Sequence, residues 1–310
     1  MTMMKTRMTR IIDPRVSYLY GAASAAPFSF LWYGCKGAKK DMSGKVGLAL
    51  GAGSTKGYAH IGVLQVLEEN GIPIDMISGC SIGSIIAGIY AAGTDLHLLE
   101  KLALELDIKS MLDIGRLNAG GLIRGDKIEE LIDILTHRKC FEETNIPLYI
   151  VAVDAGNGEL VTFRTGPVKR AVRASMSIPA IFTPVPIDGR YYVDGGVVER
   201  VPCDILRQEG ADVVISVDVG YTGGEIDVQH MNAYEMINRS IDIMQWHMAR
   251  KLTIDSDILL EPQVLYVRGH FDTKSAKNVI EEGRRVAVEA LPKIRALLKE
   301  KGIPLKNGIR

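Results

Sequence analysis

Residues 77–83, Ile-Ser-Gly-Cys-Ser-Ile-Gly, decide the fold, because they contain Gly79-x-Ser81-x-Gly83 between an apolar run and a run of small and apolar residues. A strand, this pattern and then a helix form the context of a nucleophile elbow. The sharp turn favours a positive φ at the serine and leaves no room for side chains two positions away, a need that glycine meets. The helix N-terminus behind the serine stabilises negative charge. The alternative is a glycine-rich turn with a capping serine.

The composition indicates a globular chain with a sizeable core. Of 310 residues, 47% are hydrophobic and 24% are charged, which excludes a disordered chain. This length suits one large α/β domain or two small ones. The formal net charge is zero, so no global field attracts nucleic acid or anionic lipid. Any membrane contact is therefore expected to be local and apolar.

The cysteines argue against a metal site and against a disulfide framework. Cys35, Cys80, Cys140 and Cys203 lie far apart in the chain, with no Cys-x-x-Cys pair. This pattern fits a reducing compartment, so we expect a cytoplasmic protein, with peripheral membrane contact left open. No apolar run after residue 42 approaches the roughly 18–20 residues that span a bilayer.

Residues 1–41 differ in character from the rest of the chain. Basic residues precede a mildly apolar run at 16–35, which is the charge order of a signal peptide, but Pro27 interrupts the run. We expect 1–41 to be a leader or a mis-assigned extension and 42–310 to be the folded domain. An N-terminal export signal is the alternative.

The rest of the chain alternates short apolar runs with amphipathic segments. The expected strands are 46–50, 72–78, 148–153, 159–163, 190–193, 213–218 and 258–260. The expected helices are 58–71, 82–92, 96–106, 127–136, 167–176, 203–209, 232–252 and 274–301, the last broken or bent at Pro292. This alternation predicts an α/β fold, a three-layer α/β/α sandwich with a mostly parallel central sheet.

The glycine loop at 51–57 follows the first strand and has three interpretations. A dinucleotide site requires a third glycine where Lys56 stands, and a P-loop requires the lysine after the glycine. The third interpretation is an oxyanion hole, in which consecutive backbone N–H groups face a developing negative charge. The serine motif roughly 25 residues later favours this one, because a β-α-β unit brings both loops to the same sheet edge.

Three ordered motifs together resemble the patatin-like phospholipases, most of all the bacterial members. The motifs are GAGSTKGYAHIGVL at 51–64, GCSIG at 79–83 and Asp-Gly-Gly at 194–196. Residues 173–184 and 151–154 resemble further blocks of the family. The resemblance runs from about 46 to 219, the motif core, and leaves 220–310 as a helical C-terminal part. This chain departs from the family by having Ala52, Ser54 and Lys56 where two glycines and an arginine are usual.

The resemblance implies a patatin-like fold and a Ser–Asp dyad, with Ser81 as nucleophile and Asp194 as general base. The backbone N–H groups of Gly53, Ser54 and Thr55 would form the oxyanion hole. The supporting motif residues are Gly51, Lys56, Gly57, Gly79, Gly83, Gly195 and Gly196. No metal and no cofactor is implied. The alternative for Asp194 is a plain Asp-Gly turn.

The implied activity is a serine acyl hydrolase, a lipid-degrading esterase that cleaves fatty-acyl esters, above all phospholipid or lysophospholipid, through an acyl-enzyme. One alternative is an acyltransferase with the same acyl-enzyme. Another is a regulatory adaptor with little turnover, and a nucleotide-binding protein is a third. The expected partner is a lipid or acyl-ester substrate and not a nucleic acid. Nothing in the sequence indicates the oligomeric state.

Other residues offer weaker candidates. His230, His247 or His270 would complete a Ser-Asp-His order, whereas His60 is expected to pack or to form a hydrogen bond. Apolar residues at 231–248, many of them Met, are expected to pack in the core, with an acyl-chain wall or lid as the alternative. The basic residues Arg164, Lys169, Arg170 and Arg173 are expected to form a solvated face.

Overall fold

The computed structural model describes residues 44–114, 120–220, 223–252, 255–267 and 273–306. The expected leader at 1–41 lies outside these residues, as does His270. The division of the chain at residue 42 therefore stays a prediction.

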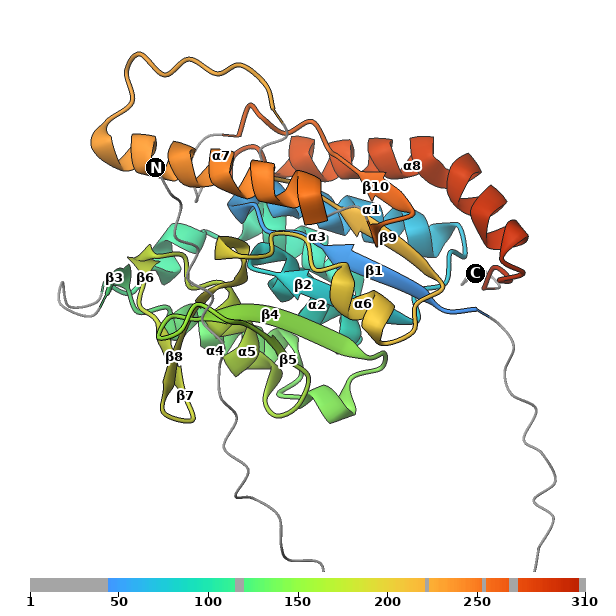
Figure 1. The fold of residues 1–310 in the computed structure, drawn as a ribbon, viewed down its shortest axis with the longest axis horizontal. Coiled ribbons are helices and arrows are strands. Elements are labelled where there is room, and N and C mark those ends of the chain that lie inside the picture. Colours follow the sequence, from blue (N-terminus) through green and yellow to red (C-terminus); the bar gives the residue numbers. More distant parts are fainter. Residues whose placement is uncertain (1–43, 115–119, 221–222, 253–254, 268–272, 307–310) are drawn as a thin grey trace, which may run out of the picture. The chain divides into compact units, whose positions relative to one another are not determined.

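Strands and helices alternate along the described chain (Figure 1). The strands are β1 (Val46–Leu50), β2 (Met76–Cys80), β3 (Gly121–Ile123), β4 (Leu148–Asp154), β5 (Leu160–Phe163), β6 (Ala180–Phe182), β7 (Val185–Ile187), β8 (Arg190–Asp194), β9 (Val213–Val217) and β10 (Ile258–Leu260). The α-helices are α1 (Ala59–Glu69), α2 (Ile82–Ala91), α3 (Leu96–Glu105), α4 (Asp126–Leu135), α5 (Val168–Ser175), α6 (Asp204–Gln208), α7 (Ala233–Leu252) and α8 (Ala276–Glu300). Short 3-10 helices are η1 (Ser54–Tyr58), η2 (Ile108–Met111), η3 (Phe141–Glu143) and η4 (Gly195–Val197).

Within the described residues, eight strands form one mixed sheet. Strands β10, β9, β1, β2 and β4 are neighbours in that order and run parallel. β5 and β8 are both antiparallel to β4, and β7 is antiparallel to β8. β3 and β6 pair in parallel as a separate two-stranded sheet. The expected mostly parallel central sheet is confirmed.

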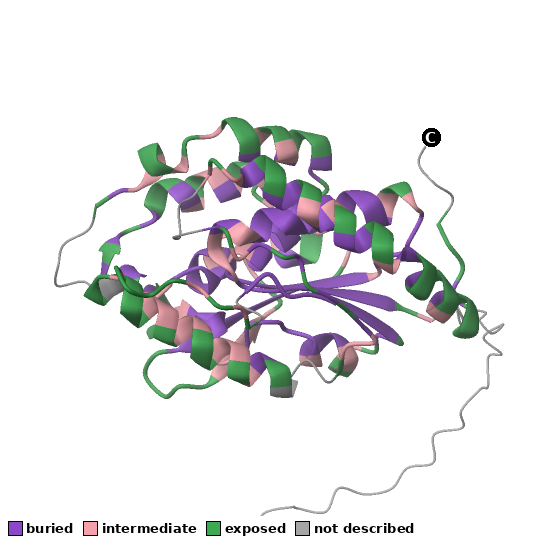
Figure 2. Cartoon of the chain, turned by 90° about the horizontal axis from the view of Figure 1, so that it is seen from above, coloured by how far each residue is buried: buried purple, intermediate pink, exposed green. Residues whose placement is uncertain are grey.

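The sheet is a middle layer because its central strands are buried on both faces. On β1, Val46, Leu48 and Leu50 belong to a large cluster with α1, α2, α5 and α8. Ala49 faces the other way and packs with residues of α6. Figure 2 shows the central strands buried and the outer faces of the helices exposed. A continuous apolar strand that is covered on both faces is typical of a parallel sheet, and the three-layer prediction is confirmed.

Several element boundaries differ from the prediction. The second strand begins at Met76, not at residue 72, because Pro73 has no N–H group and the Asp75 carboxylate accepts a hydrogen bond from the Val46 N–H at 2.8 Å. The short strands β3, β6 and β7 were not predicted from the sequence. α8 continues through Pro292 as one helix, so of the two expectations there, a break or a bend, the break does not occur.

Two predictions about side chains are wrong. On α7, Met236, Ile237 and Met244 are 42%, 61% and 58% exposed, so they are not core residues. Arg173 is only 2% exposed and does not belong to a solvated face. Its guanidinium donates hydrogen bonds to the Arg124 carbonyl and to Ser177 Oγ, which satisfies a charge that burial would otherwise penalise.

Candidate active site

The elbow has the strained geometry that its glycines indicated. Ser81 stands between β2 and α2 with φ 54° and ψ −122°. A Cβ at Gly79 would lie 2.5 Å from the Gly83 carbonyl oxygen, and one at Gly83 would lie 2.1 Å from the Leu50 carbonyl oxygen. Any side chain at either position would collide with backbone. The two glycines therefore allow the turn that presents Ser81.

Strand pairing brings Asp194 to Ser81 from 113 positions away in the chain. β5 occupies one edge of β4, while β2 and β8 lie end to end along the other edge. Cys80, the last residue of β2, pairs with Val151, and Asp194, the last residue of β8, pairs with the next residue, Ala152. The ends of β2 and β8 therefore meet. Ser81 Oγ donates a hydrogen bond to Asp194 Oδ2 at 2.5 Å.

The Asp194 carboxylate is buried, and this burial makes it a stronger base. Its pKa rises from the ordinary value to about 6, chiefly because burial penalises the charged form. Hydrogen bonds from Ser81, from the Gly196 N–H at 2.8 Å and from the Cys80 thiol favour the charged form and limit the rise. A carboxylate with this pKa is ionised at neutral pH and can accept a proton from a hydroxyl group that touches it.

The glycine loop packs directly against the elbow. A Cβ at Gly57 would lie 2.3 Å from Ile82 Cγ2, so only glycine allows η1 to approach the start of α2 this closely. Ser54 and Thr55, at the N-terminus of η1, line the same cavity as Ser81. Gly53 precedes them as the N-cap, and Lys56 follows as a half-buried residue. The expected oxyanion residues thus lie beside the serine, at a helix end whose N–H groups favour negative charge.

The start of this loop is anchored from two sides. The Gly51 N–H donates a hydrogen bond to the Val217 carbonyl at 3.0 Å. His60 Nε2 lies 2.8 Å from the Gly51 carbonyl oxygen, which requires a proton on this nitrogen. Burial lowers the pKa of His60 to about 4, so the ring is neutral at physiological pH. His60 is a hydrogen-bonding residue of the loop, in agreement with the sequence interpretation.

The structure adds one residue that sequence reasoning did not assign to the site. Ser175, the last residue of α5, accepts a hydrogen bond from the Ser81 backbone N–H at 2.9 Å. It belongs to the block at 173–184 that contributed to the family resemblance, and that membership was the available signal. Gly195, like the two glycines of the elbow, leaves no room for a side chain, since a Cβ there would lie 2.6 Å from the Val151 carbonyl oxygen.

Among the described residues, neither His230 nor His247 forms a hydrogen bond with Ser81 or Asp194. His230 and His247 are both exposed, and the His247 ring lies against Trp246. Asp194 Oδ2 is the acceptor for Ser81 Oγ, so the serine hydroxyl already has a proton acceptor.

An apolar cavity of about 140 Å³ begins at Ser81. Its walls come from the start of α1, one face of α2, and residues of α3 and α4, with Met176, Ile178 and Phe182 near the elbow. Apart from Ser54, Thr55 and Ser81, the lining is aliphatic or aromatic. None of the lining comes from α7, so its Met-rich stripe does not form this wall. An apolar cavity with a few convergent polar groups is the usual form of a small-molecule site.

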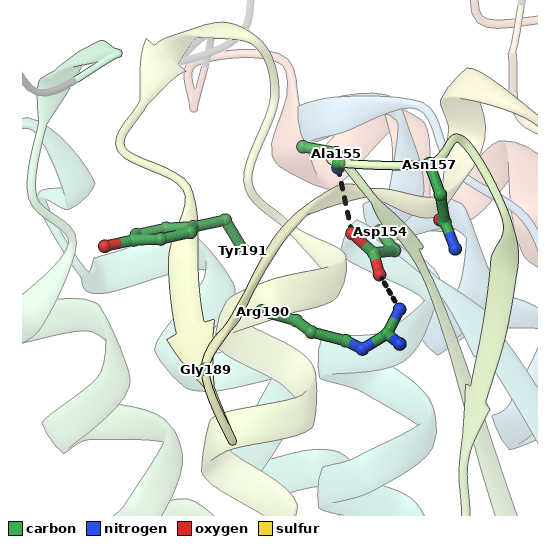
Figure 3. A pocket seen from close by; sticks show the side chains of 7 residues that line it. Asp154, Ala155, Asn157, Gly189, Arg190 and Tyr191 are labelled. Carbon is green, nitrogen blue, oxygen red and sulfur yellow. Dashed lines mark hydrogen bonds and ion pairs between the residues drawn. The ribbon is translucent and has the colours of Figure 1, made fainter.

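A second hollow, of about 420 Å³, lies at the end of β4 and beside the turn before β8 (Figure 3). Its main polar groups are Asp154 and Arg190, whose side chains point toward each other and form an ion pair at 2.5 Å. This guanidinium and the Gly156 N–H hold the pKa of Asp154 below its usual range. The pair carries no net charge, and neither Ser81 nor Asp194 lines this hollow, so we assign Asp154 a structural role in its turn.

The described part of the chain contains neither a cluster of metal-binding side chains nor a membrane-spanning helix. No three or more His, Cys, Asp or Glu side chains in that part of the chain are arranged to hold a metal ion. None of its helices is both long enough and apolar enough to cross a bilayer.

Comparisons with known proteins agree with the geometry. Residues 48–207 match the family model described as patatin-like phospholipase. An uncharacterized NTE family protein of Mycobacterium tuberculosis is 34% identical over 205 residues, which are 65% of this chain and 57% of that protein. Lysophospholipase NTE1 of Cryptococcus neoformans is 35% identical over 195 residues, 59% of this chain and 12% of that protein.

Among solved structures, VipD from Legionella pneumophila shares the fold, with a TM-score of 0.58 at 14% identity, over 81% of this chain and 67% of that one. The match covers 57% of the Mycobacterium protein and 12% of the Cryptococcus protein, so this chain spans less than two thirds of the length of these curated relatives. The family model nevertheless covers more than half of the chain and includes both the glycine loop and the Asp-Gly-Gly motif. The chain belongs to the patatin-like phospholipase family.

Proposed function

We propose that this chain is a serine acyl hydrolase that cleaves fatty-acyl esters of the phospholipid or lysophospholipid class. The observation that carries the proposal is the 2.5 Å contact between Ser81 Oγ and Asp194 Oδ2 at one end of an apolar cavity. A nucleophile paired with a buried base, beside a cavity that suits a hydrocarbon chain, matches the needs of ester cleavage on a lipid. Family membership and the name of the Cryptococcus relative, a lysophospholipase, support the substrate class.

In the first half of the reaction, Ser81 is the nucleophile and Asp194 is the general base. Ser81 Oγ attacks the ester carbonyl carbon while Asp194 Oδ2 takes the hydroxyl proton. The carbonyl oxygen becomes an oxyanion, which the N–H groups of Gly53, Ser54 and Thr55 stabilise at the N-terminus of η1. The intermediate then collapses to an acyl-enzyme, and the departing alcohol takes the proton from Asp194.

The second half repeats these steps with water. Asp194 removes a proton from the water as it attacks the acyl-enzyme, and Ser81 regains its proton as the fatty acid leaves. No step requires a metal or an organic cofactor. An acyltransferase would differ only in the acceptor, because another alcohol would replace water in this half.

Contact with a membrane surface would bring the substrate to the site. Met236, Ile237 and Met244 are exposed on α7, and a Cβ at Gly196 would lie 3.1 Å from Gln245 Nε2, so α7 passes close to the Asp194 motif. Apolar side chains gathered beside a lipid site suit peripheral contact with a bilayer. The buried thiols Cys80 and Cys203 suit the reducing conditions of the cytoplasm.

Labelling with a fluorophosphonate tests the proposed activity. We expect one adduct per chain, located on Ser81 by peptide mapping, because the carboxylate next to its hydroxyl activates it toward phosphorus as toward carbonyl carbon. Ser84 in the first turn of α2 is the matched control, because its hydroxyl donates a hydrogen bond to the Ser81 carbonyl oxygen and has no carboxylate beside it. Ser84→Ala should still be labelled. A folded protein without an adduct would support the regulatory adaptor, and a thermal shift with NAD or ATP would support nucleotide binding.

The pH dependence of the reaction should follow the ionisation of Asp194. Only the carboxylate form accepts the serine proton, and the pKa is raised to about 6, so kcat/KM should increase as pH rises through about 6 and then level off. Steady-state rates on a short-chain aryl ester, measured on both sides of this pH, provide the profile. A profile that is flat through this range, in a protein that stays folded, would contradict the assignment of the base.

A further inference from the structure

The apolar cavity runs along α2 from the protein surface into the core. Ile82, Ile85, Ile86 and Ile89 all line it, and their spacing places them on one face of the helix. Ile82 and Ile85, nearest to Ser81, are partly exposed, whereas Ile86 is 2% and Ile89 is 1% exposed. Along α2 the lining therefore passes from partly exposed residues beside Ser81 to buried residues about two helical turns away.

Three helices close the buried end. α2 ends at Ala91, and α3 begins at Leu96 after a short turn. Thr94 in that turn donates a hydrogen bond from Oγ1 to the Leu135 carbonyl oxygen at 2.6 Å, which attaches the end of α4 to the same corner. The side chains that line the cavity here are Ile89, Leu99 and Leu135, one from each helix.

Helix geometry gives the distance along the cavity from Ser81 to Ile89. Ile89 lies eight residues after Ser81, and at about 1.5 Å of rise per residue the distance along α2 is about 12 Å. An extended hydrocarbon with C–C bonds of about 1.5 Å advances about 1.25 Å per carbon, so about ten carbons reach from the nucleophile to Ile89.

We propose that this cavity binds one acyl chain of about ten carbons and that Ile89 limits the chain length. The proposal rests on the proposed acyl hydrolase function and adds its preference for medium-length chains. A shorter chain leaves apolar cavity surface unfilled and loses the gain from burial. A longer chain must displace Ile89 or Leu99, both buried in the main core cluster, which a close-packed interior resists.

The test is an acyl-length profile for the wild type and two variants of Ile89. Aryl esters that differ only in the acyl group, from butyryl to palmitoyl, are compared by kcat/KM. In the wild type, we expect the highest kcat/KM with the decanoyl ester, since a decanoyl group spans about 12 Å, the distance along α2 from Ser81 to Ile89. Ile89→Ala should move the optimum to longer acyl groups and raise kcat/KM for the palmitoyl ester relative to the decanoyl ester on the order of tenfold. Ile89→Phe should move the optimum to shorter acyl groups.

Ile294 on α8 provides the matched control. It is fully buried in the same core cluster but does not line the cavity. Ile294→Ala and Ile294→Phe change the core by the same volumes, so they should lower stability without moving the acyl-length optimum. Where Ile89→Phe fails to fold, Ile89→Met supplies a smaller extension of the side chain in the same direction.

The outcomes separate this proposal from the proposed function. A wild-type optimum at palmitoyl, an optimum that stays fixed in folded Ile89 variants, or an equal shift in the Ile294 variants would overturn the role of Ile89 while leaving the hydrolase intact. Absence of hydrolysis at every acyl length, together with an unlabelled Ser81, would instead refute the hydrolase itself.

Discussion

Replacement of Asp194 by asparagine should lower kcat about 10³-fold or more, close to the loss expected for Ser81→Ala. Asparagine keeps the shape of the side chain and its place beside Ser81 Oγ, but it cannot accept the serine proton as a carboxylate does. The double variant Ser81→Ala/Asp194→Asn should lose little more than either single variant, because members of one catalytic unit are not additive. The measurement is kcat on a short-chain aryl ester.

Histidine variants serve as the controls for this result. His230→Ala and His247→Ala should each stay within about tenfold of wild type, since both side chains are exposed and Ser81 Oγ already contacts Asp194 Oδ2. His270→Ala belongs to the same series. Each variant is first checked for cooperative unfolding. Substantial activity in Asp194→Asn, together with its loss in one folded histidine variant, would mean a conventional triad in place of the dyad.

Replacement of Asp218 by asparagine should lower the free energy of unfolding by about 3–5 kcal/mol. Asp218 forms an ion pair with Arg200, and both side chains are buried, at 5% and 1% exposure. Removing the negative charge takes the Asp218 carboxylate away from a buried guanidinium, and breaking a buried pair by removing one member is strongly destabilising. Urea unfolding of the purified variant provides the measurement.

A matched surface pair distinguishes burial from charge pairing in general. Glu289 on α8 pairs with Arg285, and both side chains are about half exposed, so Glu289→Ala should change the unfolding free energy by about 1 kcal/mol or less. The double variant Arg200→Met/Asp218→Leu should recover much of the lost stability, because apolar groups can replace a buried pair. An Asp218→Asn variant as stable as Glu289→Ala would show that Arg200 is satisfied by other groups.

The Arg200–Asp218 pair also bears on the site. The Arg200 carbonyl accepts a hydrogen bond from the Ala52 N–H at 2.9 Å, and Asp218 Oδ1 accepts one from the Gly220 N–H at 3.0 Å. The pair therefore connects the glycine loop with the end of β9. Asp218→Asn should reduce the reaction of Ser81 with a fluorophosphonate as well as stability, because the loop beside the nucleophile loses its support.

The local sequence pattern was enough to predict the parts of the fold that depend on neighbouring residues. Continuous apolar runs at 46–50 and 213–218 predicted buried strands, since a strand covered on both faces has no polar side. Gly79 and Gly83 predicted the strained turn at Ser81. A Cβ at Gly79 would collide with the Gly83 backbone inside the turn, whereas one at Gly83 would collide with the Leu50 carbonyl oxygen of β1. Ordered motifs predicted the family, which the comparisons confirm.

Predictions failed where burial depends on what packs against a segment. Helical spacing of Met and Ile on α7 suggested a core face, but no layer of the described chain covers Met236 or Met244, and both are exposed. Arg173 shows the reverse case. Its charge suggested solvent, yet the backbone carbonyls of Arg124 and Thr183, both outside its own helix, accept its hydrogen bonds and make burial tolerable.

Sequence alone thus determined the α/β alternation, the elbow and the identity of two candidate catalytic residues through their motifs. Only the tertiary structure decided that Ser81 and Asp194 touch, because this contact requires β2 and β8 to meet end to end on one edge of β4. The same holds for Ser175 and for the cavity, whose walls come from several helices. Hydrophobic periodicity reports which face of a segment is buried, and it carries no information about which distant segment will cover that face.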